Sequence, residues 1–342
     1  MSPIIEVENI SRSFRSTKKT QGSWGTWKLL WKPEFQVREA LKDVSFTLEE
    51  GTFNGLIGAN GAGKTTLLKI LTGLIPPSSG KARVLGLEPF QRSFKFRHSI
   101  SLVMGQKAQL WWDLPAIDAF DLLRAIYEIP SRIYQERLQT LANLLDVSKH
   151  LNTQIRRLSL GERMKMELIG AILHWPKVIF LDEPTIGLDV LAASKLRDFL
   201  KVFNAQEKAT IILTSHNMDD IEKLCSRVLI MQSGKLIYDG RPAKLTHEGE
   251  RRLKVRFFEA PSLQELQETT GIAQDLIECE HNQDDRSFHF SLKQERIVSV
   301  LQSLLNKYHV IDMGIEEQSL EKVIQRIYEN ELSGTQESHF KT

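Results

Sequence analysis

The stretch that decides the fold reads Gly58-Ala59-Asn60-Gly61-Ala62-Gly63-Lys64-Thr65. It matches GxxxxGK followed by Ser or Thr, and it lies between an apolar run at 53–58 and a segment at 64–74 in which leucine and isoleucine recur at helical spacing. A strand, a glycine-rich turn and a helix are the context that this motif requires. The glycines allow several backbone N–H groups to point at one phosphate, with the positive end of the helix behind them. The stretch therefore predicts a phosphate-binding loop; the alternative is a glycine-rich turn that only permits close packing.

The side chains at the end of this loop predict a nucleoside triphosphate with Mg²⁺ as the ligand. Lys64 is expected to reach the β- and γ-phosphates, and the Thr65 hydroxyl is expected to bind the metal ion. The residues of this loop that are predicted to contact the nucleotide are Gly58, Ala59, Asn60, Gly61, Ala62, Gly63, Lys64, Thr65 and Thr66.

Two acidic residues follow the apolar run at 178–181. If this run is a parallel strand, its carboxyl end meets the phosphate-binding loop at one edge of the sheet. Asp182 is then expected to bind Mg²⁺, and Glu183 to orient and polarise the attacking water. His216 follows another apolar run, at 210–214, so its imidazole can point from the same edge to the γ-phosphate. The structural alternatives are a solvated turn for the two acids and a hydrogen-bonding role for the histidine.

Length and composition limit the class of protein. The 342 residues (39.2 kDa), 41% hydrophobic and 26% charged, predict a globular protein of two to three domains. A formal charge of +2 provides no overall attraction to nucleic acid or anionic lipid. No stretch approaches the ~18 apolar residues of a membrane-spanning helix, and the first residues lack the pattern of a secretory signal. Cys225 and Cys279 lie far apart without a CxxC or Cys/His cluster, so we expect reduced thiols, no zinc site and a cytosolic chain.

The remaining pattern of the first 240 residues predicts a parallel sheet covered by helices. Runs rich in β-branched residues at 178–181, 210–214 and 228–231 are separated by helical segments, as such a sheet requires. Strands are also expected at 4–8 and 43–48. Helices are expected at 116–146, with a break at Pro130, and at 160–174.

After Pro242 the sequence alternates like half-exposed strands, at 253–258, 287–292 and 310–315, with helices at 262–269 and 295–307. This order predicts a small α+β module of ferredoxin-like type, followed by a helix at 319–330 whose apolar face is expected to close the core of the module. That face comprises Leu320, Val323, Ile324 and Ile327. The predicted domains are an α/β nucleotide-binding domain at 1–245, with a helical subdomain at about 107–175, an accessory domain at 250–332 and a tail at 333–342.

Taken in chain order, these motifs resemble the ATP-binding subunits of ATP-binding cassette (ABC) transporters over residues 4 to about 240. The resemblance implies a P-loop NTPase fold, in which a mixed core sheet is joined by an antiparallel β subdomain and a helical subdomain. Gln106 is similar to the family's glutamine that senses Mg²⁺ and the γ-phosphate. Asp189, in Gly187-Leu188-Asp189, is similar to the aspartate of the D-loop, and Phe14 is similar to the aromatic platform for adenine.

Residues 158–162, Leu-Ser-Leu-Gly-Glu, resemble the family signature Leu-Ser-Gly-Gly-Gln. Leu160 and Glu162 depart from the pattern, whereas Ser159 and Gly161 keep the hydroxyl and the amide that would contact a γ-phosphate, so we expect an active site. The resemblance implies that the signature acts in trans, presenting the amides of a helix N-terminus to ATP held by another subunit. Two chains are therefore expected to pair head to tail around two ATP molecules, either as two copies of this chain or as one copy with a different cassette.

The resemblance also implies a membrane partner. ATP hydrolysis would power transport through a separate permease subunit, with this chain peripheral on the cytoplasmic face of the membrane. The C-terminal module and Gly187-Leu188-Asp189 are similar to those of export systems, so export is expected. Trp111 and Trp112 either dock on the permease, because tryptophan is enriched at interfaces, or serve the fold, one filling the core and the other capping it.

Residues 15–38 form an insertion with six basic residues, one acidic residue and the tryptophans Trp24, Trp27 and Trp31. It is predicted either to lie at lipid headgroups or to pack its aromatic rings on the β subdomain.

Two other functions remain open: a soluble cassette ATPase acting on ribosomes or nucleic acid, and a regulatory cassette that does not hydrolyse ATP. A single cassette without a coiled coil or a basic linker weighs against the first. The presence of Lys64, Asp182, Glu183 and His216 weighs against the second.

Overall fold

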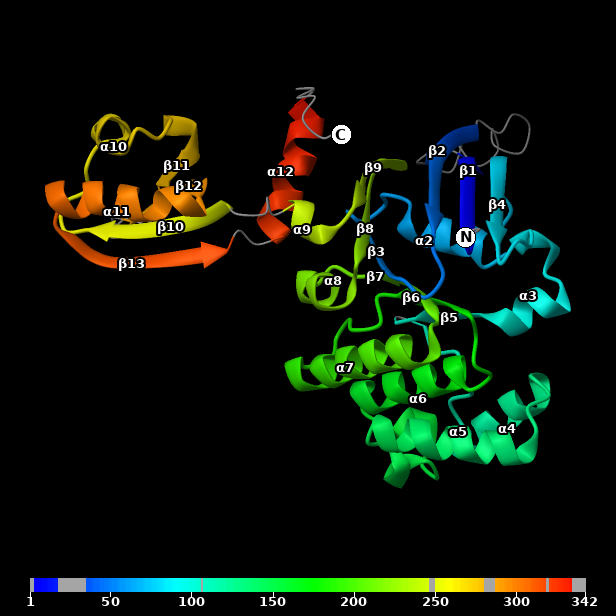
Figure 1. Cartoon of the computed structure of the whole chain (residues 1–342). Coiled ribbons are helices and arrows are strands. Elements are labelled where there is room, and N and C mark those ends of the chain that lie inside the picture. The colour runs from blue at the N-terminus through cyan, green and yellow to red at the C-terminus, as the bar shows by residue number, and fades with distance from the viewer. Residues whose placement is uncertain are drawn as a thin grey trace, which may run out of the picture. The chain divides into compact units, whose positions relative to one another are not determined.

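The computed structural model describes residues 3–17, 35–105, 107–245, 250–279, 287–317 and 320–333. The chain divides into two compact units, Met1–Arg241 and Pro242–Thr342 (Figure 1). Within the described residues, no helix combines the length and the apolar character needed to cross a membrane.

A six-stranded sheet in the order β5-β6-β7-β3-β8-β9 forms the centre of the described part of the first unit. Its strands are β3 (Phe53–Gly58), β5 (Ile100–Met104), β6 (Val178–Asp182), β7 (Thr210–Thr214), β8 (Arg227–Gln232) and β9 (Lys235–Gly240). The first five strands in this order are parallel, and β9 is antiparallel to β8. Every residue of β3 and β7 is buried, which explains why their sequences do not alternate between apolar and polar residues. The predicted parallel sheet is confirmed, with β9 as an antiparallel edge.

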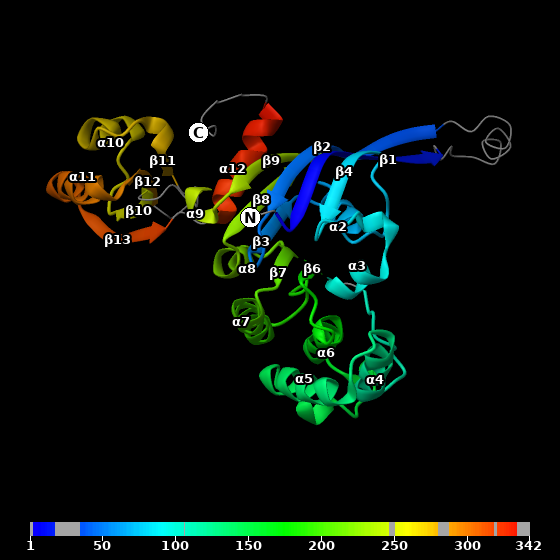
Figure 2. The same ribbon diagram turned by 45° about the vertical axis from the view of Figure 1, so that its right-hand side comes forward.

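A second, antiparallel sheet has the strand order β2-β1-β4 (Figure 2). It shares a hydrophobic core with the central sheet. Its strands are β1 (Ile5–Thr17), β2 (Phe35–Leu48) and β4 (Ser79–Val84). Ile5 and Val44 from this sheet pack in one cluster with Leu67 of helix α2 (Lys64–Leu71) and Phe180 of β6, each at most 1% exposed. The shared core fixes the antiparallel sheet against the start of α2, where the phosphate-binding loop ends.

The strands β1 and β2 include both ends of the predicted insertion at 15–38. They pair without interruption from Ser13↔Glu39 to Thr17↔Phe35. The described chain at 15–17 and 35–38 is therefore a hairpin ladder. Trp24, Trp27 and Trp31 lie outside the described residues.

The helical subdomain consists of helices α4, α5 and α6, which lie side by side in Figures 1 and 2. Phe120, Leu141 and Ile169, one from each helix, are at most 1% exposed and form its core. The predicted break at Pro130 is confirmed, because α5 begins one residue later. The helices of the first unit not yet given are α3 (Phe94–Ser99), α4 (Ala116–Ile126), α5 (Ser131–Leu144), α6 (Leu160–Ile172), α7 (Val190–Glu207) and α8 (Met218–Leu224), with 3₁₀ turns at Pro89–Gln91, Ser148–His150 and Ile155–Arg157.

Helix α2 is shorter than the predicted segment at 64–74. It ends at Leu71, and Gly73 follows in the left-handed region, at φ +72°. A Cβ atom at Gly73 would lie 2.1 Å from the carbonyl oxygen of Pro89, so only glycine fits this turn. Leu74, beyond the turn, is 46% exposed and is not part of the buried helical face.

The second unit contains a four-stranded antiparallel sheet in the order β11-β12-β10-β13 within its described residues. The chain order of strands and helices is β-α-β-β-α-β, as predicted for a ferredoxin-like module. Leu253, Phe290 and Leu304 are fully buried between the sheet and helix α11. Helix α12 lies against α9, and its residues are not in this core cluster, so among the described residues the prediction that it closes the core is wrong. The elements are α9 (Pro242–Leu245), β10 (Glu250–Phe257), α10 (Leu263–Thr270), a 3₁₀ turn (Gln274–Leu276), β11 (Ile277–Cys279), β12 (Ser287–Lys293), α11 (Gln294–Lys307), β13 (Val310–Glu317) and α12 (Leu320–Ser333).

Candidate nucleotide-binding site

The phosphate-binding loop runs from the end of β3 to the first turn of α2, as the motif predicts. Gly61 and Gly63 adopt positive φ angles of 84° and 111°. A Cβ atom on Gly63 would lie 2.6 Å from the carbonyl oxygen of Ala40, and one on Gly58 would lie 2.6 Å from that of Met231. The glycines are therefore required by the backbone path itself, and the path leaves the helix N-terminus facing the pocket.

Lys64 lies beneath this loop and is 6% exposed. Its Nζ donates hydrogen bonds to the carbonyl oxygens of Gly58, at 2.6 Å, and Ala59, at 3.3 Å. Burial lowers the pKa of Lys64, while the carboxylates of Glu183 and Asp182 oppose that change. A buried ammonium group held by carbonyl oxygens can instead bond to a phosphate placed in the loop.

Two oxygen donors expected to bind a metal ion meet at the end of β6. The Thr65 hydroxyl donates to Asp182 Oδ2 at 3.1 Å, and the Thr214 hydroxyl, at the end of β7, donates to Asp182 Oδ1 at 2.6 Å. A hydroxyl and a carboxylate are hard oxygen ligands of the kind that Mg²⁺ takes. The donor set therefore fits Mg²⁺, and Thr214 is an orienting partner that sequence reasoning did not single out.

Glu183, which is predicted to polarise the water, lies beside His216, which is predicted to face the γ-phosphate. Glu183 Oε1 lies 2.9 Å from His216 Nε2, and the two side chains are 16% and 45% exposed. Glu183 has a positive φ of 55°, and its N–H is held by the carbonyl and the hydroxyl of Thr214, each at 3.0 Å. A non-glycine residue in this region stores backbone strain that its neighbours must hold in place. In this conformation Glu183 lines the pocket described below.

A pocket of about 440 Å³ connects the loop, Lys64, Thr65 and Glu183, whereas Asp182 and His216 are not among its lining residues. It is lined by Phe14, Arg38, Ala40, Asn60, Gly61, Ala62, Gly63, Lys64, Thr65, Thr66 and Glu183. Phe14 lies at its mouth, 38% exposed, with the Arg12 guanidinium 4.8 Å from the ring centroid. Arg38 is the cross-strand neighbour of Phe14. Sequence reasoning missed Arg38 because only the β1–β2 register, which has no local signal, brings it to the pocket.

The signature residues lie outside this pocket, at the N-terminus of α6. The Ser159 hydroxyl donates to Glu162 Oε2 at 2.8 Å and accepts the Glu162 N–H at 3.3 Å, while the Ser159 N–H donates to Oε2 at 3.0 Å. This is a capping box. Glutamate and glutamine can both occupy its last position, so Glu162, which stands where the family signature has glutamine, preserves the local structure. Hydrogen bonds from Ser159 lower the pKa of Glu162, and His150 pairs with its other oxygen at 2.9 Å. Leu160 projects toward Gly187, where an added Cβ would lie 2.9 Å from its Cδ2.

Asp189 starts helix α7 as its N-cap. Its Oδ1 accepts the Ala192 N–H at 2.8 Å. Like the signature, it does not line the nucleotide pocket. Gln106 lies outside the described residues, so its expected role stays a prediction.

Comparisons with known proteins agree with this geometry. A family profile described as "ABC transporter" matches residues 41–186. The ABC transporter ATP-binding protein NatA of Bacillus subtilis is 31% identical over 248 residues, which are 72% of this chain and 93% of NatA. The chain belongs to the ABC transporter ATP-binding proteins. The methionine import ATP-binding protein MetN 2 of Enterococcus faecalis is 27% identical over 243 residues, 70% of each protein. Among solved structures, a dimeric post-hydrolysis state of the ATP-binding cassette MJ0796 bound to ADP and Pi matches with a TM-score of 0.58 and 21% identity, over 69% of this chain and 98% of that one.

In this ABC cassette, the buried Glu167 of helix α6, which begins at the signature, is hydrogen-bonded to the segment after Gln106. Glu167, 5% exposed, accepts the Gln109 N–H at 3.0 Å and the Leu110 N–H at 3.2 Å. Burial raises the pKa of Glu167, and the two N–H groups partly offset this rise. The sequence carried a signal for this contact, since an acid within the apolar run Met166-Glu167-Leu168 needs a partner.

Two adjacent tryptophans of the helical subdomain, Trp111 and Trp112, are half exposed, at 45% and 48%. The alternative in which one of them fills the core is wrong, because Leu110, 5% exposed, is the buried residue of this segment. The guanidinium of Arg163 lies 5.2 Å from a ring centroid of Trp112. The two indoles therefore leave apolar surface exposed to solvent.

Proposed function

We propose that this chain is the ATP-hydrolysing subunit of an ABC transporter and powers export through a separate membrane subunit. The observation that carries the proposal is the Glu183–His216 pair, 2.9 Å apart, beside the Thr65–Asp182 pair and the buried Lys64. A cassette that only bound nucleotide would need the loop and Lys64, but it would not need a carboxylate held against an imidazole at the pocket.

ATP binding would use the loop, Lys64 and the hairpin. The triphosphate would accept hydrogen bonds from the loop N–H groups, and Lys64 would exchange its bonds to Gly58 and Ala59 for bonds to phosphate oxygens. Adenine would stack on Phe14, with Arg38 as a further cation near the loop, since a Cβ on Gly61 would lie 3.2 Å from Arg38 Nη2.

Thr65 and Asp182, with Gln106 as a further expected ligand, would hold Mg²⁺. When bound, the metal ion offsets negative charge on the β- and γ-phosphates. The Thr214 hydroxyl orients Asp182 for this role, because it already occupies one carboxylate oxygen.

Hydrolysis would proceed by attack of water on the γ-phosphorus. Glu183 accepts the proton of the water as the new P–O bond forms, and the bond to the bridging oxygen of ADP breaks, giving ADP and inorganic phosphate. His216 holds the Glu183 carboxylate from its other side. The backbone of Glu183 supports this orientation through its two hydrogen bonds to Thr214.

The signature would act on ATP held by a second cassette. Ser159 to Glu162 line no part of the pocket in their own chain, yet they begin a helix whose first N–H groups can face an anion. We propose a head-to-tail dimer, with a second copy of this chain as the partner and a different cassette as the alternative.

The membrane subunit would dock at Trp111 and Trp112, at the cytoplasmic face of the membrane. Large exposed aromatic side chains are the typical centres of protein interfaces. The direction of transport is proposed from the resemblance of the C-terminal unit to that of export systems, although one relative, MetN 2, is named as an import protein. Transport into inside-out vesicles that contain both subunits would support export, and uptake into right-side-out cells alone would contradict it.

The experiment that tests hydrolysis is Glu183→Gln. We expect kcat to fall by about 10²–10⁴-fold, the usual contribution of a general base, while ATP still binds and holds two chains together. ATPase assays and size-exclusion chromatography with and without ATP measure the two effects. The same change at the exposed Glu268 of the second unit is the control. A Glu183→Gln variant that hydrolyses ATP at the parent rate would remove Glu183 from this role.

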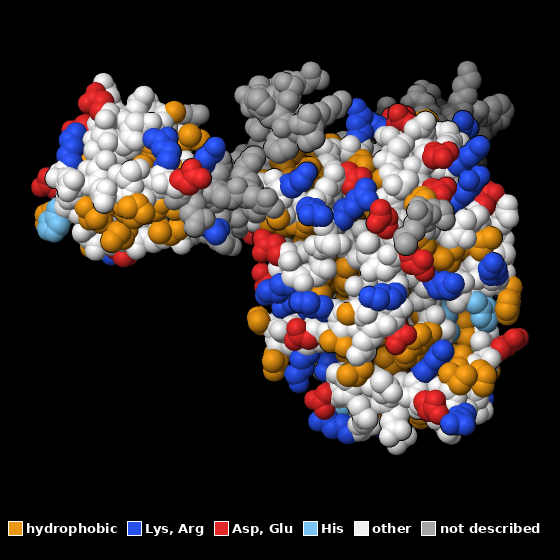
Figure 3. All heavy atoms as spheres, in the orientation of Figure 1, with side chains coloured by type: hydrophobic (Ala, Val, Ile, Leu, Met, Phe, Trp, Pro, Cys, Tyr) orange, Lys and Arg blue, Asp and Glu red, His pale blue; other side chains and the backbone are white. Residues whose placement is uncertain are grey.

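The nucleic-acid alternative has no support on the surface in view. In Figure 3, Lys and Arg side chains are interspersed with Asp and Glu over the visible face of the first unit, and no continuous basic stripe crosses it. Binding of single-stranded RNA or duplex DNA at physiological salt would favour that alternative.

A further inference from the structure

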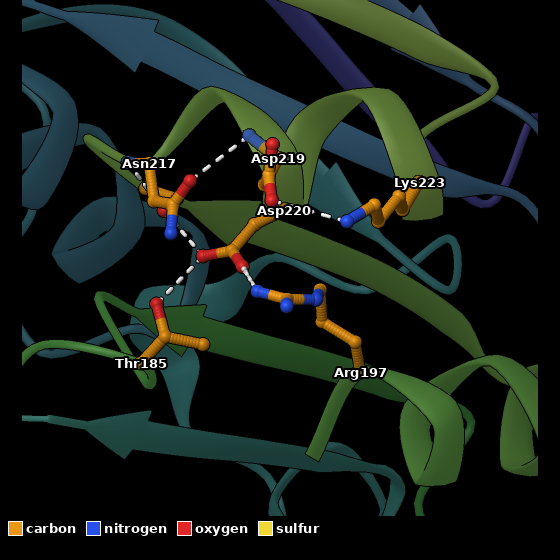
Figure 4. Close-up of polar contacts among 7 residues, drawn as sticks. Thr185, Arg197, Asn217, Asp219, Asp220 and Lys223 are labelled. Atoms are coloured by element: carbon orange, nitrogen blue, oxygen red, sulfur yellow. Dashed lines mark hydrogen bonds and ion pairs between the residues drawn. The ribbon is translucent and has the colours of Figure 1, made fainter. Parts of the chain in front are cut away.

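A buried carboxylate lies beneath the two loops that carry Glu183 and His216. Asp220, on α8, is 0% exposed. Its charge is balanced by Arg197 of α7, which is 6% exposed and whose Nη1 lies 2.8 Å from Asp220 Oδ1 (Figure 4). Separating the two side chains would leave a buried charge without a partner, which is energetically costly. The ion pair therefore holds Asp220 in place.

The other oxygen of this carboxylate accepts hydrogen bonds from two hydroxyl groups. Thr185 Oγ1 donates to Asp220 Oδ2 at 2.6 Å, and Ser215 Oγ donates to the same oxygen at 2.7 Å. Thr185 lies two residues after Glu183, and Ser215 directly precedes His216. One oxygen atom therefore joins the segment that carries the general base to the segment that carries its imidazole partner.

The Ser215 hydroxyl is oriented by a further contact. It accepts the Asn217 N–H at 3.0 Å, so its proton is directed to Asp220. The side chain of Asn217 in turn accepts the Asp219 N–H at 2.9 Å, as Figure 4 shows. The residues directly before and after His216 in the chain are therefore both hydrogen-bonded to the first turn of α8.

The strained backbone of Glu183 makes such support necessary. At φ +55°, Glu183 occupies a region that is unfavourable for a residue with a side chain. Thr214 holds its N–H on one side, and Thr185, through Asp220, holds the chain on the other.

We propose that Asp220, neutralised by Arg197, is a positioning residue that sets the distance between Glu183 and His216 through Thr185 and Ser215. This inference rests on the proposed function, because it assigns a role in ATP hydrolysis. It concerns groups that contact neither nucleotide nor water in the pocket, since none of these four residues lines it.

The test removes one hydroxyl at a time and leaves the buried ion pair intact. Asp220→Asn would leave Arg197 without a charged partner and could unfold the chain, so it is not the first choice. Thr185→Val keeps the shape of the side chain but cannot donate to Asp220. Thr185→Ser restores the donor with a smaller side chain and is the matched control. Ser215→Ala makes the corresponding change on the His216 side.

The measurements are kcat, KM and ATP affinity of the purified full chain, with its thermal midpoint. We expect Thr185→Val and Ser215→Ala to lower kcat by about 10–100-fold, since a displacement approaching 1 Å costs about that much. KM and ATP affinity should change by less than about threefold, because Lys64 and the loop are untouched, and Thr185→Ser should recover kcat to within about threefold of the parent. A role in stability alone would move the thermal midpoint and leave kcat of the folded protein unchanged.

The outcomes separate this inference from the proposed function. A parent protein without ATPase activity, or one no faster than Glu183→Gln, would overturn the proposed function. An active parent and an inactive Glu183→Gln, with Thr185→Val and Ser215→Ala both at the parent kcat, would overturn the positioning role alone. Equal loss of kcat in Thr185→Val and Thr185→Ser would also overturn it, because the hydroxyl would then be irrelevant.

Discussion

A substitution at Gly105 would displace Glu183, the proposed general base, without altering the Glu183 side chain itself. Gly105 follows β5, and its N–H donates to the carbonyl of Asp182 at 2.8 Å. A Cβ atom added to it would lie 2.0 Å from the carbonyl oxygen of Glu183 and 2.9 Å from the carbonyl carbon. The obstacle is backbone, so no side chain can rotate away.

The size of the displacement follows from these distances. Contacts of Cβ atoms essentially never fall below 3.0 Å, so in Gly105→Ala the Glu183 carbonyl and Cβ must separate by about 1 Å more. A shift of about 1 Å in a reacting geometry costs about 10²-fold in rate. We therefore expect kcat to fall about 100-fold, with the free energy of unfolding lowered by about 1–3 kcal/mol by the overpacking.

The assay is steady-state ATP hydrolysis at a temperature well below the thermal midpoint of the variant, with ATP affinity measured separately. Affinity should stay within about threefold of the parent, because Gly105 does not line the pocket. Gly314→Ala is the control, since an added Cβ there meets nothing within 4 Å and the backbone φ is ordinary. A folded Gly105→Ala protein with kcat within threefold of the parent would refute the reasoning.

Further predictions concern stability. Burial lowers the pKa of His174 from 6.5 to about 4, so between these values the unfolded chain binds a proton that the folded chain does not. The free energy of unfolding should therefore fall by about 3 kcal/mol as the pH drops from 6.5 to 4. His174→Phe keeps an aromatic ring where His174 stacks on Tyr127, with ring centroids 3.9 Å apart. In this variant, the difference in the free energy of unfolding between pH 7.5 and pH 4.5, measured by urea unfolding, should be smaller than in the parent. An equal difference in both proteins would contradict the lowered pKa of His174. Ser159→Ala removes the acceptor for the Glu162 N–H and should cost about 1 kcal/mol in thermal unfolding, whereas Glu162→Gln keeps the capping box and should cost less than about 0.5 kcal/mol. The reverse order would show that the His150 ion pair, not the cap, stabilises this helix start.

The sequence predicted the parts of the fold whose signals are local. The glycine loop, the start of α2, the buried strands β6 and β7 and the order of elements in the second unit all follow from spacing and apolar pattern over short windows. Lys64, Thr65, Asp182, Glu183 and His216 were named on the same basis, and the structure brings them to one sheet edge.

The missed features depend on pairing between distant segments. Arg38 reaches the pocket only because it pairs with Phe14 across a hairpin, and Asp220 gains its partners from α7 and from two loops. The early end of α2 depends on how closely the Pro89 carbonyl approaches Gly73. The pattern of apolar residues in a short stretch of sequence does not predict these distances, because they are set by the packing of the whole unit.

The β1–β2 hairpin has a consequence for how this chain could change in length. Its ladder continues for three residues on each strand beyond Phe14↔Arg38, as far as Thr17↔Phe35. Because the two strand ends are neighbours, a segment joining them can double in length at a cost of only about 0.6 kcal/mol. A slip of one residue in the ladder, by contrast, would turn Phe14 to the opposite face of the sheet. The hairpin therefore tolerates insertions between its two strand ends, whereas the register of its strands must stay the same for Phe14 to remain at the pocket.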